Sequence, residues 1–486
     1  MTTILALLPF RPVDGVIALP AIAALLLAAL PGRRRSAAIN VVASFLTFLL
    51  ATTLLIERPA PGDYVFVDDL NVVFVVLGTF VGFTTSVFSA SYIAHEIDAG
   101  KLSPGQLRFY HGMYQALAFA MNLGLLADNI GLMWVAVELA TLTTVLMVGI
   151  YRTHDALEAA WKYFILGSVG IALALFGTIL VYMAAQPAIG EGEKAMVWTV
   201  LVAEAAKFNP ELLNVAFVFL MLGYGTKVGL APLHAWLPDA HAEGPTPISA
   251  VLSGLLLNVA LYALLRFKML LAANPQTVAP GPLMVTLGLV SLIFAGFMLY
   301  RRRDIKRLFA YSSIEHMGLV TFAFGMGGPL ANFAGLLHMT MHSLTKSSIF
   351  FAVGQIAQAK GTQRLSEIRG LTQSHPMLGW SLVVGVAAIA GLPPLGIFMS
   401  EFLIVSSTFA RAPLLAIPLV FGLLVAFGAL VLRLTDVAFG EPEGSSAPVD
   451  ASYLPMVAHL ALVLTAGLWL PAPLVEWFQH VARMLG

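Results

Sequence analysis

Two ionisable side chains stand alone inside long apolar segments of this sequence. Glu138 is the only charged residue between Asp128 and Arg152, and Lys227 lies about 16 residues beyond Glu211, roughly 24 Å along a helix. A charge at that depth in a bilayer costs on the order of a few kcal/mol. Burial disfavours the charged form of each side chain, whereas pairing with an opposite charge favours it. Small changes in the distance between a glutamate and a lysine therefore change their proton affinities. We expect Glu138 and Lys227 to handle protons as a pair; a static salt bridge is the alternative.

A second group of ionisable residues recurs at four-residue spacing. His338, His342 and Lys346 share one face of a predicted helix. Histidine titrates near neutral pH and lysine does so once desolvated, so this stripe indicates a proton relay. Packed histidines that only join helices are the alternative. Two histidines at this spacing also suit a metal, but no carboxylate on the same helix completes a ligand set, and we predict no metal site.

Two further residues extend this polar series. Glu401 follows Pro394 by seven residues and suits a proton entry or exit, with an interfacial glutamate as the alternative. His316 lies about nine residues beyond Arg307, so a helix places it at mid-depth. We expect the neighbouring Glu315 to point elsewhere on that helix.

Other polar residues have a simpler explanation. Lys162 follows Glu158 by four residues, which is typical of a surface pair. His234, Asp239 and His241 could suggest zinc, but the surrounding prolines favour a rigid capping loop. No phosphate-binding loop or nucleophile elbow occurs in a credible context, so we do not expect an ATPase or a hydrolase.

The composition explains why these charges are exceptional. Of 486 residues, 59% are hydrophobic and only 11% are charged, which excludes an ordinary soluble domain and a disordered chain. Lys+Arg and Asp+Glu are both 26, so no bulk charge indicates nucleic acid. Cysteine is absent, which excludes iron–sulfur clusters, disulfides and thiolate zinc sites from this chain. We therefore expect no cofactor and no redox catalysis by this chain alone.

An all-α integral membrane protein with about 14 transmembrane helices follows from the apolar runs, since a span needs about 20 residues. The predicted spans are Val13–Leu30, Ala37–Ile56, Leu70–Ile93, Met113–Ala127, Ile130–Ile150, Ala159–Ala185, Leu212–Leu233, Pro247–Leu271, Leu283–Tyr300, Leu308–Phe324, Asn332–Gln358, Met377–Phe409, Pro413–Phe439 and Tyr453–Val481. Arg33, Arg34 and Arg35 follow the first run rather than precede it, which argues against a cleaved signal peptide.

Two of these helices are interrupted by prolines. Pro232 breaks the seventh, and Pro393 with Pro394 breaks the twelfth, because proline removes a backbone donor and clashes with the preceding turn. Paired breaks of this kind indicate inverted repeats in ion-coupled transporters. The repeats would be residues 110–272 (helices four to eight) and 282–440 (helices nine to thirteen), between the N-terminal helices one to three in residues 1–94 and a last helix in residues 452–486. Two unrelated proline kinks are the alternative.

The loop charges predict an orientation. One side carries about 15 Lys and Arg and the other about 8, so the positive-inside rule places the richer side in the cytoplasm. With an even number of spans, both termini then lie on the non-cytoplasmic side of the cell inner membrane.

Three segments resemble a known family. They are Lys227 to His241 (KVGLAPLHAWLPDAH), Tyr311 to Gly318 (YSSIEHMG) and Gly391 to Glu401 (GLPPLGIFMSE). They are similar to the antiporter-like subunits of complex I, of group 4 membrane-bound [NiFe]-hydrogenases and of multisubunit Na+/H+ antiporters. Within that family, two segments most resemble the hydrogenase-4 component F group. They are Ala127–Asn129 leading to Glu138, and Arg152–Thr153 leading to Ala159–Phe164.

The resemblance implies a role for each matching residue. Glu138 and Lys227 match the central proton-handling pair, His316, His342 and Lys346 match the central polar axis, and Glu401 matches the terminal acid or base. Asn258 is a departure, because several relatives carry a lysine there and an amide cannot hold a proton. Implied partners are other antiporter-like and small membrane subunits, a membrane anchor, lipid, and a peripheral iron–sulfur/[NiFe]-hydrogenase-like or quinone-reducing arm.

Three functions remain open from the sequence. The first is proton translocation driven by redox chemistry in a partner, along Glu138, Lys227, Lys346, His342, His338, His316 and Glu401. The second is Na+/H+ exchange within a multisubunit antiporter. The third is a non-conducting scaffold whose polar axis only fixes helix packing.

Overall fold

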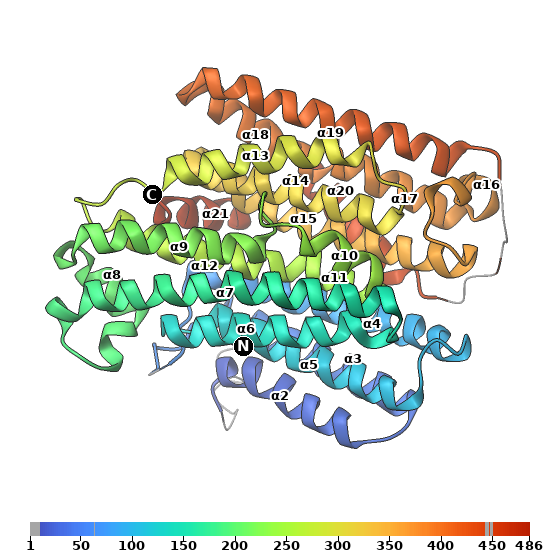
Figure 1. Ribbon diagram of the computed structural model, residues 1–486, viewed down its shortest axis with the longest axis horizontal. Coiled ribbons are helices and arrows are strands. Elements are labelled where there is room, and N and C mark those ends of the chain that lie inside the picture. The colour runs from blue at the N-terminus through green and yellow to red at the C-terminus, as the bar shows by residue number, and fades with distance from the viewer. Residues whose placement is uncertain (1–9, 63, 443–446, 448–450) are drawn as a thin grey trace. The chain divides into compact units, whose positions relative to one another are not determined.

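The computed structural model describes residues 10–62, 64–442, 447 and 451–486, and in these ranges the chain is helical apart from loops and three isolated β-bridges. Figure 1 shows the helices in chain order. The first half contains α2 Pro12–Ala29, α3 Arg33–Thr53, α4 Asp69–Asp98, α5 Pro104–Leu126, α6 Ile130–Val148, α7 His154–Ile189, α8 Trp198–Glu204, α9 Pro210–Val228, α10 Trp236–Glu243, α11 Thr246–Val251, the π-helix η4 Leu252–Leu256 and α12 Leu257–Ala272. The second half contains α13 Gly281–Leu299, α14 Ile305–Met326, α15 Pro329–Lys360, α16 Leu371–Ser374, α17 Pro376–Ile389, α18 Gly396–Arg411, α19 Pro413–Phe439, α20 Leu454–Leu468 and α21 Ala472–Met484.

These helices form two compact units. Unit 1 comprises Met1–Lys227 and Asn258–Pro280, and unit 2 comprises Val228–Leu257 and Gly281–Gly486. The segment that follows Lys227 therefore belongs to unit 2, where α10 packs against α14 and α11 packs against α15. Each unit is described by itself below.

The chain is of the membrane-spanning type. Among the described residues, nine helices are long and apolar enough to cross a bilayer, or ten if α20 and α21 count as one bent span. Every span predicted from the sequence overlaps a helix or a broken helix pair. The helices α14 and α15, of 22 and 32 residues, are not among the nine, because their sequences carry many polar side chains.

Both predicted helix breaks are present. The helix α9 ends at Val228 and is followed by Gly229 with φ +82°. The helix α17 ends at Ile389, and α18 begins only at Gly396. Proline cannot donate a hydrogen bond to the preceding turn, so neither helix continues through its break.

The predicted last span, Tyr453–Val481, is wrong as a single helix. It consists of α20 and α21, which are bent by 82° between Leu468 and Ala472. Pro471 caps the N-terminus of α21, where its missing N–H and fixed φ end one helix and begin the next. The π-helix η4, inside the predicted eighth span, was also not expected from the sequence.

Unit 1 has two opposite ends that hydrogen bonds hold together. At one end Arg33 pairs with Asp98, and Gln106 donates to the Ile150 carbonyl at 2.5 Å. At the other end Asp128 accepts hydrogen bonds from the backbone and hydroxyl of Thr199 at 3.0 and 2.8 Å. The loops predicted to be cytoplasmic and those predicted to be external thus gather at opposite ends of this unit.

Small residues bring α7 and α9 into close contact. A Cβ added at Gly170 would lie 2.7 Å from the Cβ of Thr226, and one at Gly177 would lie 2.7 Å from Cγ of Leu220. Backbones in membrane proteins approach closely where glycine faces the neighbouring helix. This contact fixes the last turn of α9, which carries Lys227.

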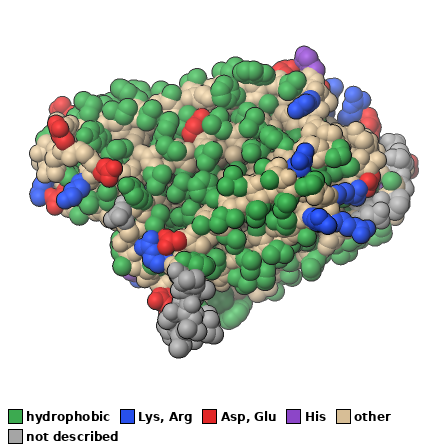
Figure 2. Space-filling model, turned by 90° about the horizontal axis from the view of Figure 1, so that it is seen from below, with side chains coloured by type: hydrophobic (Ala, Val, Ile, Leu, Met, Phe, Trp, Pro, Cys, Tyr) green, Lys and Arg blue, Asp and Glu red, His purple; other side chains and the backbone are tan. Residues whose placement is uncertain are grey.

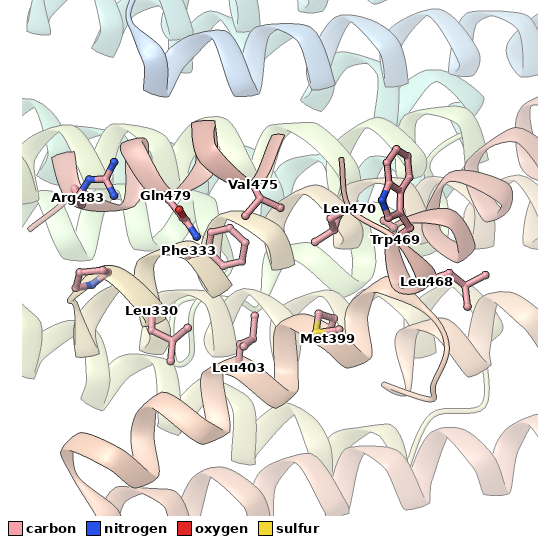
Figure 3. A pocket seen from close by; sticks show the side chains of 13 residues that line it. Leu330, Phe333, Met399, Leu403, Leu468, Trp469, Leu470, Val475, Gln479 and Arg483 are labelled. Atoms are coloured by element: carbon pink, nitrogen blue, oxygen red, sulfur yellow. The ribbon is translucent and has the colours of Figure 1, made fainter. Parts of the chain in front are cut away.

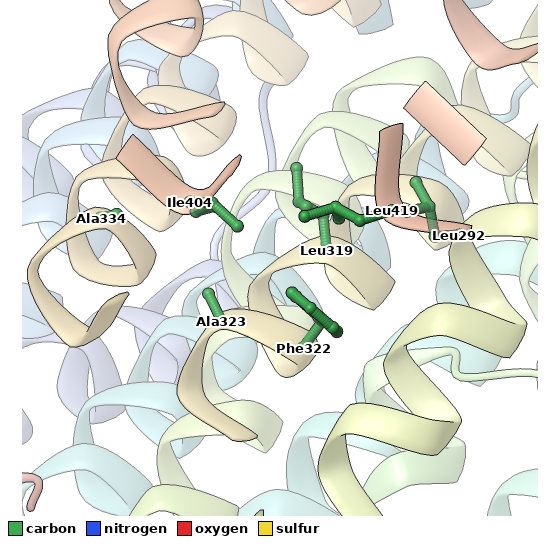
Figure 4. Close-up of a cluster of buried hydrophobic side chains, with 7 residues drawn as sticks. All are labelled: Leu292, Leu319, Phe322, Ala323, Ala334, Ile404 and Leu419. Carbon is green, nitrogen blue, oxygen red and sulfur yellow. The ribbon is translucent and has the colours of Figure 1, made fainter. Parts of the chain in front are cut away.

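Unit 2 is built around α14 and α15, which are buried along most of their length. A cluster of buried apolar side chains packs them against α13, α18 and α19 (Figure 4). Its members are Leu292, Leu319, Phe322, Ala323, Ala334, Ile404 and Leu419. Polar side chains on these two inner helices are therefore enclosed by apolar packing.

The outward surface is apolar, as a lipid-facing surface must be. Large hydrophobic side chains are exposed along the outer helices, with Leu25 at 74%, Leu414 at 79% and Leu454 at 71%. Figure 2 shows hydrophobic side chains covering most of the visible face. Such a surface is stable only in contact with lipid or with another apolar surface.

Candidate functional site

Lys227 is buried and lies beside Glu138 in unit 1. The side chain of Lys227 is 1% exposed, and its Nζ lies 3.9 Å from Oε2 of Glu138 on α6. The shorter contact of Nζ is a 2.7 Å hydrogen bond to Oγ1 of Thr141, one turn further along α6. Oε2 of Glu138 has no hydrogen-bond partner among the described residues. The expected pair is thus formed, as a loose ion pair beside one firm hydrogen bond.

Neighbouring helix α7 fixes the position of the Lys227 ammonium. A Cβ at Gly167 would lie 2.8 Å from Nζ, so any larger residue there would displace the ammonium from this position. The ring of Tyr163 lies 5.9 Å from Nζ, and its hydroxyl hydrogen-bonds Thr144 at 2.8 Å. An ammonium near an aromatic face gains a favourable electrostatic contact.

A chain of hydrogen bonds joins three helices in unit 2. Nδ1 of His316 on α14 lies 3.0 Å from Nε2 of His338 on α15. Nδ1 of His338 lies 2.9 Å from Oγ of Ser400 on α18, whose hydroxyl donates to the Ile397 carbonyl at 2.8 Å. All three side chains are buried, so no bulk water competes for these bonds.

Glu315 faces this cluster, against the expectation that it points elsewhere. Its Oε2 lies 3.1 Å from Nε2 of His316, and both side chains are at most 2% exposed. The angles of this contact are not those of a hydrogen bond, so the two atoms are close neighbours without being hydrogen-bonded. A helix can bring adjacent side chains together in this way when both are turned towards the same neighbouring helices.

Glu401 comes to the same place from the far side of the twelfth-helix break. One of its carboxylate oxygens and one ring nitrogen each of His316 and His338 lie within 4.8 Å of one another. Gly391, with φ +68°, leaves the space that the Glu401 carboxylate fills, and a Cβ there would overlap it. The break therefore positions Glu401 as well as interrupting the helix.

The remaining members of the predicted stripe line α15 near the cluster. The rings of His342 and His316 have centroids 5.5 Å apart, and neither ring nitrogen of His342 has a hydrogen-bond partner in the described part of the chain. Nζ of Lys346 donates to the Phe309 carbonyl at 2.8 Å and lies 5.7 Å from the Phe309 ring centroid. His338, His342 and Lys346 are all fully buried.

His316, His338 and Glu401 have the donor atoms of a divalent-metal site, although α15 alone lacks a carboxylate. The facing nitrogens of the two imidazoles are, however, already joined by their mutual hydrogen bond. The arrangement as it stands is that of a hydrogen-bonded relay.

Lys162, His234 and Asn258 are possible auxiliary residues of the proton path. Lys162 pairs with Glu158 at 2.6 Å with about half of each side chain exposed, as expected for a surface pair. His234 packs against the ring of Phe294, with centroids 4.8 Å apart. Asn258 is buried in α12, directly after the π-helix η4.

Sequence reasoning missed three polar residues of the site: Thr141, Glu315 and Ser400. Thr141 follows Glu138 by three positions, so helical spacing alone could have identified it. Ser400 and Glu315 precede Glu401 and His316 directly, and only the packing of α14, α15 and α18 turns them inward.

One hollow of unit 2 is lined by none of the residues of this cluster. It has a volume of about 530 Å³ beside the bend between α20 and α21. Figure 3 shows Trp469, Leu330, Met399 and Phe333 on its walls, with Gln479 and Arg483 towards one end. Its lining contains neither histidine nor carboxylate, so it is not part of the polar cluster.

Known proteins share both the sequence and the fold. The family model described as NADH:quinone oxidoreductase/Mrp antiporter, TM, matches residues 127–427. A hydrogenase-4 component F homolog of Methylacidiphilum infernorum is 63% identical over 471 residues, which cover 97% of this chain and 99% of that protein. The F(420)H(2) dehydrogenase subunit N of Methanosarcina mazei is 29% identical, covering 76% of each chain.

Solved structures agree on the fold. A chain of an archaeal membrane-bound sulfane sulfur reductase superposes with a TM-score of 0.85 at 22% identity, covering 97% of both chains. A chain of Thermus thermophilus respiratory complex I superposes with a TM-score of 0.80 at 22% identity, covering 98% of this chain and 100% of that one. On its family match and its 63% identical relative, this chain belongs to the antiporter-like membrane subunits of the NADH:quinone oxidoreductase/Mrp antiporter family.

Proposed function

We propose that this chain translocates protons through the membrane, driven by redox chemistry in a partner of the same complex. The observation that carries the proposal is the Lys227 ammonium, 1% exposed and 3.9 Å from Glu138. Removing water from both charges costs free energy that only close pairing offsets. A buried pair held this loosely is therefore poorly suited to a purely structural role. It suits a pair whose separation, and thus proton affinity, changes during turnover.

The histidine cluster supports the second half of the path. Protons would pass Glu138 and Lys227 in unit 1, and then Lys346, His342, His316, His338 and Glu401 in unit 2, or the reverse. Each group in unit 2 is buried or half-buried and lies on a helix that contacts the next. The imidazoles can donate and accept a proton at once, which is the property a relay requires.

The architecture that we propose has 14 spans. Residues 110–272 and 282–440 would be inverted repeats, each with one broken helix, between the N-terminal helices of 1–94 and the last helix pair in 452–486. The two opposite ends of unit 1 support an orientation with both termini outside the cytoplasm of an inner-membrane protein.

The partners that we propose are those of a respiratory-type membrane complex. They are other antiporter-like and small membrane subunits, a membrane anchor and a peripheral iron–sulfur, [NiFe]-hydrogenase-like or quinone-reducing arm. The name of the 63% identical relative, a hydrogenase-4 component F homolog, supports the hydrogenase-like choice. The absence of cysteine from this chain requires any iron–sulfur cluster to reside in another subunit.

The test is Lys227→Ala in the intact complex, reconstituted in vesicles with a pH-sensitive dye inside. We expect assembly to be retained and coupled proton translocation to be lost. The matched control is Lys162→Ala, which removes an exposed lysine from the same unit and should translocate as the wild type does. Normal translocation by Lys227→Ala would refute the proposal and favour a scaffold.

Repeating the assay with and without sodium separates the remaining alternative. Proton movement that needs a sodium gradient and no redox substrate would favour Na+/H+ exchange instead.

A further inference from the structure

The direction of the hydrogen bonds in the histidine cluster follows from its end at Ser400. The Ser400 hydroxyl has one hydrogen, which it donates to the Ile397 carbonyl. In the 2.9 Å contact between Ser400 Oγ and His338 Nδ1, the imidazole must therefore be the donor. A neutral His338 with its hydrogen on Nδ1 has a lone pair at Nε2.

The same reasoning fixes His316. Its Nδ1 lies 3.0 Å from the lone pair at Nε2 of His338, so His316 donates in this bond. A neutral His316 then has a lone pair at its own Nε2, and that atom lies 3.1 Å from Oε2 of Glu315. A nitrogen lone pair and an ionised carboxylate oxygen repel at this distance. The two atoms are not aligned for a hydrogen bond, so the Glu315 carboxyl group has to rotate before a proton passes between them.

The charges around Glu315 also favour an additional proton in this cluster. Glu315 interacts electrostatically with the Lys346 ammonium and with the Glu401 carboxyl group. The other titratable groups facing these three from the packed helices of unit 2 are His316, His338, His342 and His241. With these imidazoles neutral, an ionised Glu315 balances the Lys346 ammonium, and an ionised Glu401 would place a second carboxylate charge near Glu315, which is unfavourable.

We propose that Glu315 passes a proton to His316 and, through it, to His338, a role that rests on the proposed function. A proton that moves from the Glu315 carboxyl to Nε2 of His316 sends the Nδ1 proton of His316 to Nε2 of His338. The doubly protonated His338 then lies within 4.8 Å of Glu401, a distance that one bridging water spans. Glu401 takes up the proton, which leaves His316 with its hydrogen on Nε2 beside the ionised Glu315. His316 has to return to the tautomer with its hydrogen on Nδ1 before the next proton neutralises Glu315.

The experiment is Glu315→Gln in the intact complex, with translocation and thermal stability measured together. The amide keeps the shape of the side chain but cannot exchange a proton. We expect translocation to fall more than about tenfold, in line with the loss of a positioned acid, at an unchanged unfolding midpoint. Glu315→Asp should restore much of it, and the matched control Glu367→Gln, which alters an exposed carboxylate, should have no effect.

Full translocation by Glu315→Gln overturns the inference. If Lys227→Ala is then still inactive, the proposed function stands and only the role of Glu315 is withdrawn; if both variants translocate normally, both fail. Should Glu315→Gln not assemble, Ser400→Ala tests the same relay with every charge retained. It removes the acceptor that orients His338 and should slow translocation, and a normal rate in that variant also overturns the inference.

Discussion

The Lys227 ammonium is held by one short contact and one long one. Its 2.7 Å hydrogen bond to Thr141 fixes the nitrogen, whereas the 3.9 Å separation from Glu138 leaves room for movement. The attraction between unlike charges varies steeply with distance where water is excluded. The position of Nζ therefore matters as much as its charge.

Gly167→Ala tests that position without removing a charge. The added methyl group would lie 2.8 Å from Nζ and 3.3 Å from Cγ2 of Thr141, so Nζ has to move. We expect proton translocation by the reconstituted complex to fall at least about tenfold, since alanine also favours the helix and α7 stays folded. Gly82→Ala is the matched control, because no atom lies within 4 Å of a methyl group added there. Equal rates in the two variants would show that the ammonium position is unimportant.

At the scale of elements, an ion pair joins α4 to α12. Arg266 on α12 is 1% exposed and donates two hydrogen bonds, of 2.7 and 2.8 Å, to Asp68, the N-cap of α4. Its guanidinium also lies 4.8 Å from the Phe66 ring and 4.3 Å from the Trp198 ring. Loss of the carboxylate charge would leave this buried arginine without its hydrogen-bonded carboxylate partner.

Asp68→Asn is expected to destabilise unit 1 by about 3–5 kcal/mol, the usual cost of removing one partner of a buried ion pair. Asn retains the side-chain oxygen that caps α4, so the change isolates the charge. The measurement is the thermal unfolding midpoint of the purified complex. Asp14→Asn, in an exposed pair with Arg11, should cost less than about 1 kcal/mol, and equal losses in the two variants would contradict this account.

The same pair predicts a pH dependence. Burial raises the pKa of Asp68, but the charge and hydrogen bonds of Arg266 more than offset this and hold the pKa below its ordinary value. The pair therefore stabilises the fold fully above about pH 4, near the pKa of an unfolded aspartate, and the stabilisation is lost as the pH falls through the lower folded value. The difference in unfolding midpoint between wild type and Asp68→Asn should be constant above about pH 4 and shrink below it. A difference that grows on acidification would be inconsistent with the pair.

For the whole molecule, the charges of the loops predict its orientation in the membrane. In unit 1 the loop of Lys101 and the loop of Glu193 belong to opposite ends, since three helices, α5, α6 and α7, connect them in alternating directions. The positive-inside rule places Lys101 in the cytoplasm and Glu193 outside. Because the chain has no cysteine, a single introduced thiol reports one site only.

Cysteine labelling of intact cells tests this orientation. We expect a membrane-impermeant maleimide to label Glu193→Cys directly and Lys101→Cys only after the membrane is permeabilised. Labelling of Lys101→Cys alone in intact cells would reverse the topology. Equal labelling of both before permeabilisation would mean that the cells were not sealed.

Much of the architecture was predictable because it depends on local properties of the chain. Length, apolar runs and prolines predict membrane helices and their breaks, and a charge in an apolar run is visible without a fold. Glu138, Lys227, His338 and Lys346 were therefore found from the sequence, as were the breaks at Pro232 and Pro393. The bend at Pro471 was missed, because the surrounding apolar residues read as one continuous span.

Side-chain direction and partnership, by contrast, were decided only by tertiary packing. Glu315 and His316 are adjacent, and nothing in their spacing shows that both turn towards α15 and α18. Likewise, Ser400 gains its role only because the twelfth-helix break places it beside His338. The sequence determined which residues carry protonable groups at membrane depth. The close approach of helices through glycines determined which of those groups touch, since contact depends on ångström-scale packing between segments far apart in the chain.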